Sequence, residues 1–135
     1  PYTKNIKRSL LKEPKVYLYN WALVKNEGAR FENFIASHLL KSCHYWTDCA
    51  FGEFELYYLR DKDKREVDFL VCVGKKPWFC VEAKATFKEL PVSLKYFSTN
   101  LKIPFSYLVV KEEGINYLKD SIRIISASKF LRGLV

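Results

Sequence analysis

The sequence predicts an α/β protein whose mixed sheet contains a three-strand antiparallel meander flanked by helices. Two observations carry this prediction. Runs of apolar residues with strand character alternate with stretches in which apolar residues recur at helical spacing. In the middle of the chain, three strand-like runs are separated only by short polar turns, which is typical of strands joined by hairpins.

The first half of the chain opens with an extended segment or strand and continues with a helix. The segment at 15–24 is rich in Val, Tyr and Leu and follows Pro14. A helix is expected over 26–46, with Asn26 as its N-cap. The residues expected on its apolar face are Phe31, Phe34, Ile35, His38, Leu39 and Ser42. In this position His38 is expected to be a buried structural histidine.

The meander comes next, and the second half of the chain completes the sheet. The turns at 61–64 and 74–77 are polar or contain Gly and Pro. Pro91 suits the start of a helix, and Ser126 or Ser128 can cap the last helix. The expected elements are strands at 54–60, 65–73 and 78–85, a helix at 90–101, strands at 105–110 and 122–126, and a helix at 126–134.

Composition narrows the class of protein and its partners. The 135 residues suffice for one domain with a real core, expected to span 1–135, and 49% hydrophobic residues exclude a disordered chain. A formal net charge of +8 favours an anionic partner, with nucleic acid ahead of an acidic protein or a membrane surface. No apolar stretch approaches the roughly 20 residues that span a bilayer, so no membrane partner is expected.

The cysteines predict a reducing compartment. The 4 cysteines lack paired metal-ligand spacing, and Cys72 and Cys80 lie within apolar runs, where free cysteine acts as a small hydrophobe. We therefore expect reduced thiols and an intracellular protein of the cytoplasm. A Cys72–Cys80 disulfide remains an alternative if these strands form a tight hairpin.

Charged residues appear at the far end of two strands of the meander. Because alternate residues of a strand share a face, the turn at 74–77 brings two rows to the same side of the sheet. These rows are Asp68, Leu70 and Cys72, and Trp78, Cys80, Glu82 and Lys84. The opposite face is expected to be core, formed by Val67, Phe69, Val71, Phe79, Val81 and Ala83. Asp68 is thus expected to lie close to Glu82 or Lys84.

Two neighbouring carboxylates repel each other unless a positive charge lies between them. Mg²⁺, or Mn²⁺ in its place, binds through one or two carboxylates plus waters, which matches Asp68 and Glu82. Lys84 would then orient a metal-bound water or neutralise a phosphate oxygen, the requirements of metal-assisted phosphodiester hydrolysis. The other interpretation is a cross-strand ion-pair cluster at a solvated sheet end.

The acid of V67-D68, the hairpin and then E82-A83-K84 resemble the pattern of the PD-(D/E)xK nuclease superfamily, with Val67 where proline is usual. These nucleases often carry a further carboxylate on a preceding helix. Glu32 matches it within a G-x-x-F-E pattern, and Glu27 is the competing candidate.

A closer resemblance covers nearly the whole chain. Blocks such as "GARFENFIASHLL", "YYLRDKDKREVDFLV" and "ISASKFLRGL" resemble the C-terminal domain of unknown function (number 4143) of prokaryotic AAA-type ATPases. The resemblance implies a restriction-endonuclease-like core and an ATPase module elsewhere in a longer chain. These residues contain no G-x-x-x-x-G-K-[ST] loop, so no ATPase activity is expected from them alone. Asn20 and Ala22 stand where the family usually has aspartate and then glycine.

The resulting expectation is Mg²⁺-dependent cleavage of DNA. Asp68, Glu82 and the Ala83 carbonyl would hold the metal, Glu32 would bind it directly or through water, and Lys84 would act on the attacking water. One alternative is a non-catalytic DNA- or protein-binding module that regulates a fused AAA-type ATPase. Another is a junction-resolving enzyme that acts as a symmetric dimer.

Basic residues near the meander are the candidates for phosphate contacts. They are Lys62, Lys64 and Arg65 at one turn, Lys75 and Lys76 at the other, and Lys88 and Lys95 after the third strand. Lys88 and Lys95 are expected to lie nearest the metal.

Overall fold

A computed structural model describes residues 10–11, 26–60, 63 and 65–134. The elements are β1 (Leu10–Leu11), α3 (Glu27–Asp48), β2 (Phe54–Arg60), β3 (Glu66–Val73), β4 (Lys76–Lys84), α4 (Val92–Asn100), β5 (Phe105–Val110), β6 (Asn116–Lys119), β7 (Ile122–Ser126) and α5 (Ala127–Gly133). The strand or extended segment expected at 15–24 lies outside the described residues.

The sheet is mixed, as predicted. In the described part of the chain its strand order is β1-β2-β3-β4-β5-β7-β6. β1 to β4 pair antiparallel, which confirms the meander. β4, β5 and β7 run parallel, and β6 returns antiparallel against β7. The carboxyl ends of three strands therefore meet at one edge of the sheet.

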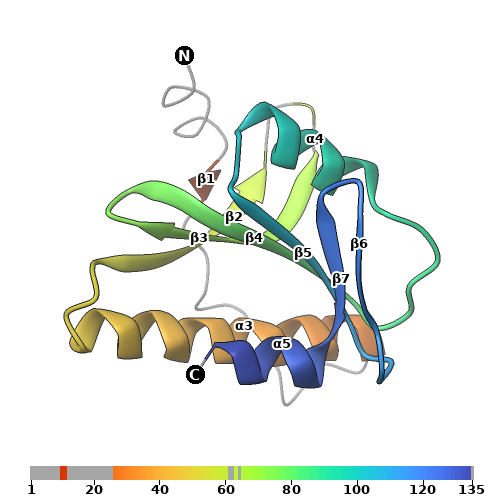
Figure 1. Cartoon of the computed structure of the whole chain (residues 1–135), viewed down its shortest axis with the longest axis horizontal. Coiled ribbons are helices and arrows are strands. Elements are labelled where there is room, and N and C mark those ends of the chain that lie inside the picture. The colour runs from red at the N-terminus through yellow and green to blue at the C-terminus, as the bar shows by residue number, and fades with distance from the viewer. Residues whose placement is uncertain (1–9, 12–25, 61–62, 64, 135) are drawn as a thin grey trace.

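Helices cover the two faces of the sheet (Figure 1). One face packs against α3 and α5 through a core that includes Ile35, Leu39 and Phe130, and we call it the α3 side. The other face packs against α4 through Leu94 and Phe97, and we call it the α4 side. Because the central strands are buried on both faces, β3 and β4 read as nearly continuous apolar runs.

Helix α3 begins where the sequence predicts, because the Asn26 side chain accepts a hydrogen bond from the Ala29 amide at 3.1 Å. Its expected apolar face is only partly correct. Ile35 is buried, whereas Phe34 is 45% exposed and His38 is half-buried, with their rings packed edge to face at 4.6 Å. Phe34 and His38 are one turn apart on the flank of the helix, so they pack on each other instead of on the sheet.

The β3–β4 hairpin has a two-residue turn. Gly74 and Lys75 both have positive φ, 57° and 69°, as the favoured hairpin turn requires. The pairing of the two strands is irregular after this turn. Val71 pairs with Phe79 but Cys72 pairs with Pro77, so Trp78 is an extra residue in β4. Trp78 consequently packs on the α3 side, 5.4 Å from the Trp46 ring, so its predicted place in the row of Cys80 and Glu82 was wrong.

A second irregularity lies at the other end of β3. Val67 packs in the α4-side core, whereas Phe69 packs in the α3-side core. The predicted placement of both residues on one face was therefore wrong, because the alternation breaks at the intervening residue, Asp68. The neighbouring strand also changes register here, between Tyr57 and Leu59.

Several features bear on the remaining expectations. All 4 residues of β6 are exposed, so this strand has no apolar alternation by which the sequence could predict it. The four cysteines are free, which excludes the Cys72–Cys80 disulfide in this structure. None of the helices in the described residues has an apolar stretch long enough to cross a bilayer.

The packing of α4 can be tested with two substitutions on the same helix. Phe97 is 1% exposed, and its replacement by alanine is expected to reduce the free energy of unfolding by about 3–5 kcal/mol. Val92 is 79% exposed, so Val92→Ala should change it by about 0.5 kcal/mol or less. Urea unfolding monitored by circular dichroism measures both, and equal effects would contradict this placement of α4.

Candidate functional site

The ladder between β3 and β4 ends at the pair Phe69 and Val81, and side chains join the strands beyond it. The Asp68 amide donates to Glu82 Oε1 at 3.0 Å. The Ala83 amide donates to Asp68 Oδ2 at 2.8 Å. Each strand therefore supplies a carboxylate that accepts a main-chain hydrogen bond from the other strand. The expected proximity of Asp68 and Glu82 is present, and the break in alternation at Asp68 accompanies it.

Lys84 is the third residue of this group. Its Nζ lies 3.5 Å from Glu82 Oε2, and its side chain is 49% exposed. The two oxygens of Glu82 thus have different partners, a main-chain amide on one and an ammonium on the other. The ammonium is held at the site and stays accessible to a ligand from solvent.

Burial and like charge both act on the carboxylates. Burial raises the pKa of Asp68 well above its ordinary value, and the negative charges of Glu82 and Glu32 raise it further. The hydrogen bond from the Ala83 amide and the positive charge of Lys84 lower it, but by less. The pKa of Glu82 is also raised, chiefly by burial and further by the charge of Glu32. The Asp68 amide and Lys84 lower it only in part. The positive groups around the pair therefore compensate only part of the cost of holding these two anions together, partly out of water.

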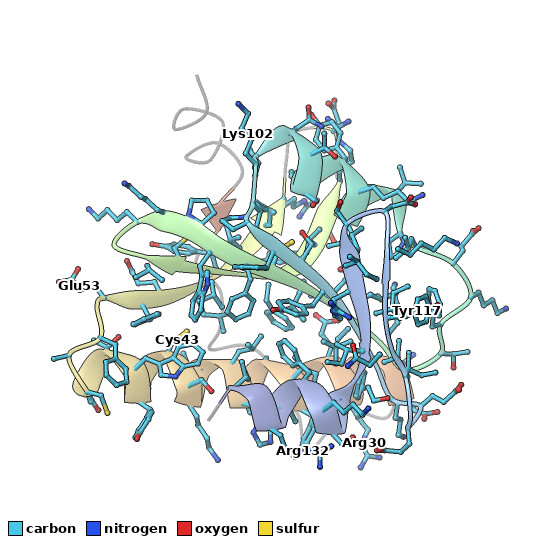
Figure 2. All side chains as sticks on the ribbon, viewed as in Figure 1. Arg30, Cys43, Glu53, Lys102, Tyr117 and Arg132 are labelled. Atoms are coloured by element: carbon cyan, nitrogen blue, oxygen red, sulfur yellow. The ribbon has the colours of Figure 1, made fainter. Side chains whose placement is uncertain are left out.

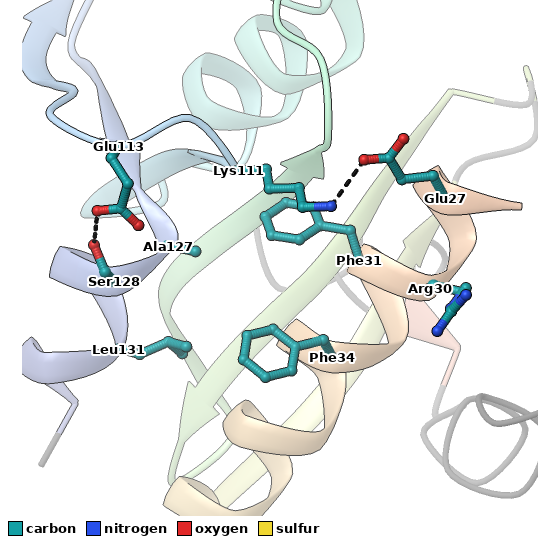
Figure 3. A pocket seen from close by; sticks show the side chains of 9 residues that line it. All are labelled: Glu27, Arg30, Phe31, Phe34, Lys111, Glu113, Ala127, Ser128 and Leu131. Atoms are coloured by element: carbon teal, nitrogen blue, oxygen red, sulfur yellow. Dashed lines mark hydrogen bonds and ion pairs between the residues drawn. The ribbon is translucent and has the colours of Figure 1, made fainter.

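Glu32 reaches this region from α3. The first turn of α3 is tied to the carboxyl end of β5 by an ion pair of 2.8 Å between Glu27 and Lys111 (Figure 3). Glu27, the competing candidate, is engaged there. Glu32 lies near enough for its charge to raise the pKa of both Asp68 and Glu82. Within the described ranges, however, no three His, Cys, Asp or Glu side chains are grouped closely enough to hold one metal ion.

The donor set of Asp68 and Glu82 fits a hard divalent cation. Mg²⁺ uses one or two protein carboxylates and retains several waters, so a third carboxylate in direct contact is not required. Within a strand, the N–H and C=O of one residue point to the same edge. Since the Ala83 amide donates toward β3, its carbonyl faces the same gap between the strands. Asp68, Glu82 and the Ala83 carbonyl therefore fit such an ion, and Glu32 fits a role through water.

The predicted phosphate contacts lie in several places. Lys62 and Lys64 are outside the described residues. Arg65 binds Asp63 at 3.1 Å, with its guanidinium 3.5 Å from the centre of the Tyr96 ring. The Arg65 guanidinium is thus already engaged within the protein, which makes it a weaker candidate for binding phosphate.

The hairpin lysines and Lys95 lie toward the other end of the sheet. Lys76 is six residues before Glu82 along β4, about 20 Å away, and Lys75 is in the adjoining turn. Lys95 pairs with Asp120 at 3.4 Å, where β7 begins, so its expected place nearest the metal was wrong. Lys88 is exposed and follows Lys84 by four residues, and it remains a candidate for contact near the carboxylates.

Tyr58 is a neighbour of the site that the sequence did not indicate. Burial and a hydrogen bond with Glu66 raise its pKa, and the charge of Asp68 contributes to the rise. Tyr58 lies at the irregularity in β2, between Tyr57 and Leu59. Its side-chain direction depends on that irregularity, so strand alternation alone does not place it near Asp68.

One pocket among the described residues is lined by neither Asp68 nor Glu82. This pocket of about 740 Å³ lies between α3 and α5. Figure 3 shows Phe31, Phe34 and Leu131 along it, with Glu27 bonded to Lys111 at one end and Glu113 to Ser128 at the other. Its charged side chains are mostly paired within the protein, so it does not provide the chemistry of the site.

The fold and site together define a class: an α/β protein with a mixed sheet that brings a buried and a partly buried carboxylate and a lysine to one sheet edge. Residues 27–130 match the model of the family described as "Domain of unknown function (DUF4143)", and the chain belongs to this family. No curated protein and no solved structure matched the chain.

The charge at Asp68 makes the stability of the metal-free protein depend on pH. A carboxyl whose pKa is raised on folding loses stabilisation as pH rises from its unfolded pKa of about 3.9 to its folded pKa. Asp68→Asn should therefore raise Tm at pH 7, by about 3–5 °C for each kcal/mol gained, and the gain should shrink near pH 4. Thermal unfolding in EDTA measures this.

Glu27→Gln provides the matched control, because Lys111 lowers the pKa of Glu27. Its ionised form is the stabilising one, so any effect should be a lower Tm at pH 7 that fades as the pH falls toward 4. The same sign for both variants would contradict the electrostatic account.

Proposed function

We propose that this domain is a Mg²⁺-dependent phosphodiester hydrolase acting on DNA, with a restriction-endonuclease-like core of the PD-(D/E)xK superfamily. The observation that carries the proposal is the adjoining pair of carboxylates, buried Glu82 and partly buried Asp68, whose pKa values are both raised. Purely structural ion pairs lower the pKa of their carboxylates, whereas this pair is electrostatically unfavourable without a further cation.

The residues would divide the work by position. Asp68, Glu82 and the Ala83 carbonyl would hold Mg²⁺ or Mn²⁺, with Glu32 acting through an intervening water. The bound ion would supply an attacking water of lowered pKa and would screen the negative charge that grows at phosphorus. Lys84, held by Glu82 and half exposed, would orient that water or stabilise the developing charge.

Charge and composition support DNA as the substrate and the cytoplasm as the compartment. The net charge of +8 favours a polyanion, and Lys88 lies exposed just after the site. Free thiols, three of them buried, suit a reducing compartment. Within this proposal, residues 1–135 form a single nuclease-like domain of a longer chain whose AAA-type ATPase module lies outside them.

The second candidate is a non-catalytic module that binds DNA or protein and regulates the fused ATPase. It is favoured by the absence, among the described residues, of any three-membered group of metal-ligating side chains. The same fold can serve as a binding platform without chemistry. A symmetric dimer that resolves DNA junctions is a special case of the hydrolase and requires the same carboxylates.

Cleavage assays distinguish the two candidates. The protein is incubated with single-stranded, duplex and branched DNA in Mg²⁺ or Mn²⁺. Asp68→Ala and Lys84→Ala are each expected to reduce the rate by about 10²- to 10⁴-fold, because each removes a group that acts on the reacting atoms. Lys76→Ala removes one positive charge about 20 Å from Glu82 and should cleave nearly as wild type. Absence of wild-type cleavage, or equal rates in all variants, would exclude the hydrolase.

Metal binding can be tested without activity. Wild-type Tm should rise with Mg²⁺ concentration, and saturation at 100 times Kd corresponds to about 2.7 kcal/mol. The rise should weaken as pH falls, because Asp68 and Glu82 must ionise to bind. Asp68→Asn should abolish it, while Glu27→Gln should retain it. A Mg²⁺ response that persists in Asp68→Asn would place the ion elsewhere.

A further inference from the structure

A second, smaller pocket adjoins Lys84 on the α4 side. It measures about 260 Å³ and is lined by Ala85, Thr86, Phe87, Val110, Glu112, Ile115 and Tyr117. Lys84 is paired directly with Val110 in the parallel ladder of β4 and β5. Neighbouring strands are about 4.8 Å apart, so a wall of the pocket begins one strand away from the lysine.

Side-chain direction places the pocket and Lys84 on the same face of the sheet. Cys80 and Val110 pack in the α4-side core, and strand alternation puts Lys84 on that side as well. The lining residues Ala85 to Phe87 continue directly from Lys84, so the Phe87 Cα lies within about 10 Å of the Lys84 Cα. A phosphate held at Lys84 would therefore place an adjoining nucleoside at this pocket.

The lining suits a flat, uncharged, hydrogen-bonding group. Phe87 and Tyr117 provide aromatic surface. Tyr117 is 43% exposed and belongs to β6, the outermost strand of the sheet (Figure 2). No ring contact of Tyr117 is found among the described residues. Glu112 is the one charged residue in the described lining, and its carboxylate disfavours a phosphate while accepting hydrogen bonds from amino groups.

We propose that this pocket receives the nucleobase next to the scissile phosphate, so that the domain acts on single-stranded or unpaired DNA. The inference rests on the proposed function of the Asp68 and Glu82 site. A base can enter only after it leaves the helical stack, which costs least in unpaired DNA. Stacking on Phe87 and Tyr117 stabilises it there, and Glu112 accepts from an exocyclic amino group, favouring cytosine or adenine over thymine.

An organic cation would also suit an aromatic pocket with one carboxylate. The adjoining Lys84 ammonium and the net charge of +8 disfavour it. A base attached to a polyanion is favoured by the same charges, because the phosphates lie toward the lysine while the uncharged base enters the pocket.

Binding experiments in EDTA test the pocket without requiring cleavage. Short single-stranded oligonucleotides carrying 2-aminopurine at a defined position report stacking as fluorescence quenching. Wild type should quench the probe and bind single strands more tightly than the matching duplex. Tyr117→Leu, which retains apolar contact, should lose the quenching and bind roughly 5- to 100-fold more weakly. Circular dichroism confirms that the variant is folded.

Two further variants complete the test. Phe51→Leu removes an aromatic ring that is 68% exposed in the loop after α3, and it should quench and bind as wild type. The base preference is measured with oligonucleotides that carry cytosine or thymine in place of 2-aminopurine. Glu112→Gln should bring the ratio of their affinities toward one, because the acceptor-only carboxylate becomes an amide that both donates and accepts. Equal loss in Phe51→Leu and Tyr117→Leu would overturn the proposed pocket.

The outcomes separate the two proposals. Quenching that depends on Tyr117, in a protein that cleaves no DNA, would retain the base pocket and exclude the hydrolase. Cleavage that depends on Asp68, with binding unaffected by Tyr117→Leu and Glu112→Gln, would retain the hydrolase and overturn the base pocket. The base pocket would also be overturned if millimolar arginine amide displaced the probe and single-stranded and duplex DNA bound equally well. That result would identify a cation site.

Discussion

The hydrogen bonds that the Glu82 and Asp68 carboxylates accept from main-chain amides of the opposite strand are the constraint on which the site depends. Where the β3–β4 ladder ends, each carboxylate takes a main-chain amide of the other strand, at 3.0 and 2.8 Å. The strands thus separate without leaving these amides unpaired, which would otherwise be costly in a buried sheet. In exchange, two carboxylates lie side by side, with Glu82 buried and Asp68 partly buried. The exchange of ladder hydrogen bonds for carboxylate hydrogen bonds therefore produces both the gap between the strands and the excess negative charge in it.

The rest of the fold supports that unfavourable arrangement. β4 is paired on both sides and buried on both faces, so the position of Glu82 is fixed by a large part of the core. The Asn26 cap and the Glu27–Lys111 ion pair fix the start of α3 at the same sheet edge. Phe31, 7% exposed, packs into the α3-side core, and the next residue, Glu32, is directed about 100° around the helix axis. A rigid scaffold is what allows carboxylates to remain together when their charges oppose it.

Sequence periodicity predicted the parts of this structure that follow regular geometry. The strands at 54–60, 105–110 and 122–126 have their predicted bounds, and the α3 cap is the predicted Asn26. Alternation also placed Asp68 close to Glu82 or Lys84, because both ends of a tight hairpin are tied to one register. It failed at Trp78 and Val67, where irregular pairing shifts a residue to the other face. A bulge depends on cross-strand geometry, and nothing in the local pattern of either strand marks it.

The same limit explains why a neighbouring pocket escapes sequence reasoning even when the charged residues do not. Asp68, Glu82 and Lys84 are conspicuous because they interrupt apolar strands. Thr86, Glu112 and Tyr117 belong to polar connections and to an exposed edge strand, where such residues are ordinary. They converge only because β4 and β5 are parallel and end at one edge, which is where open α/β sheets bind ligands. The core fixes the carboxylates, while these connections carry little core packing. Their residues can change without moving Asp68 or Glu82, so the pocket lining can vary independently of the carboxylates beside it.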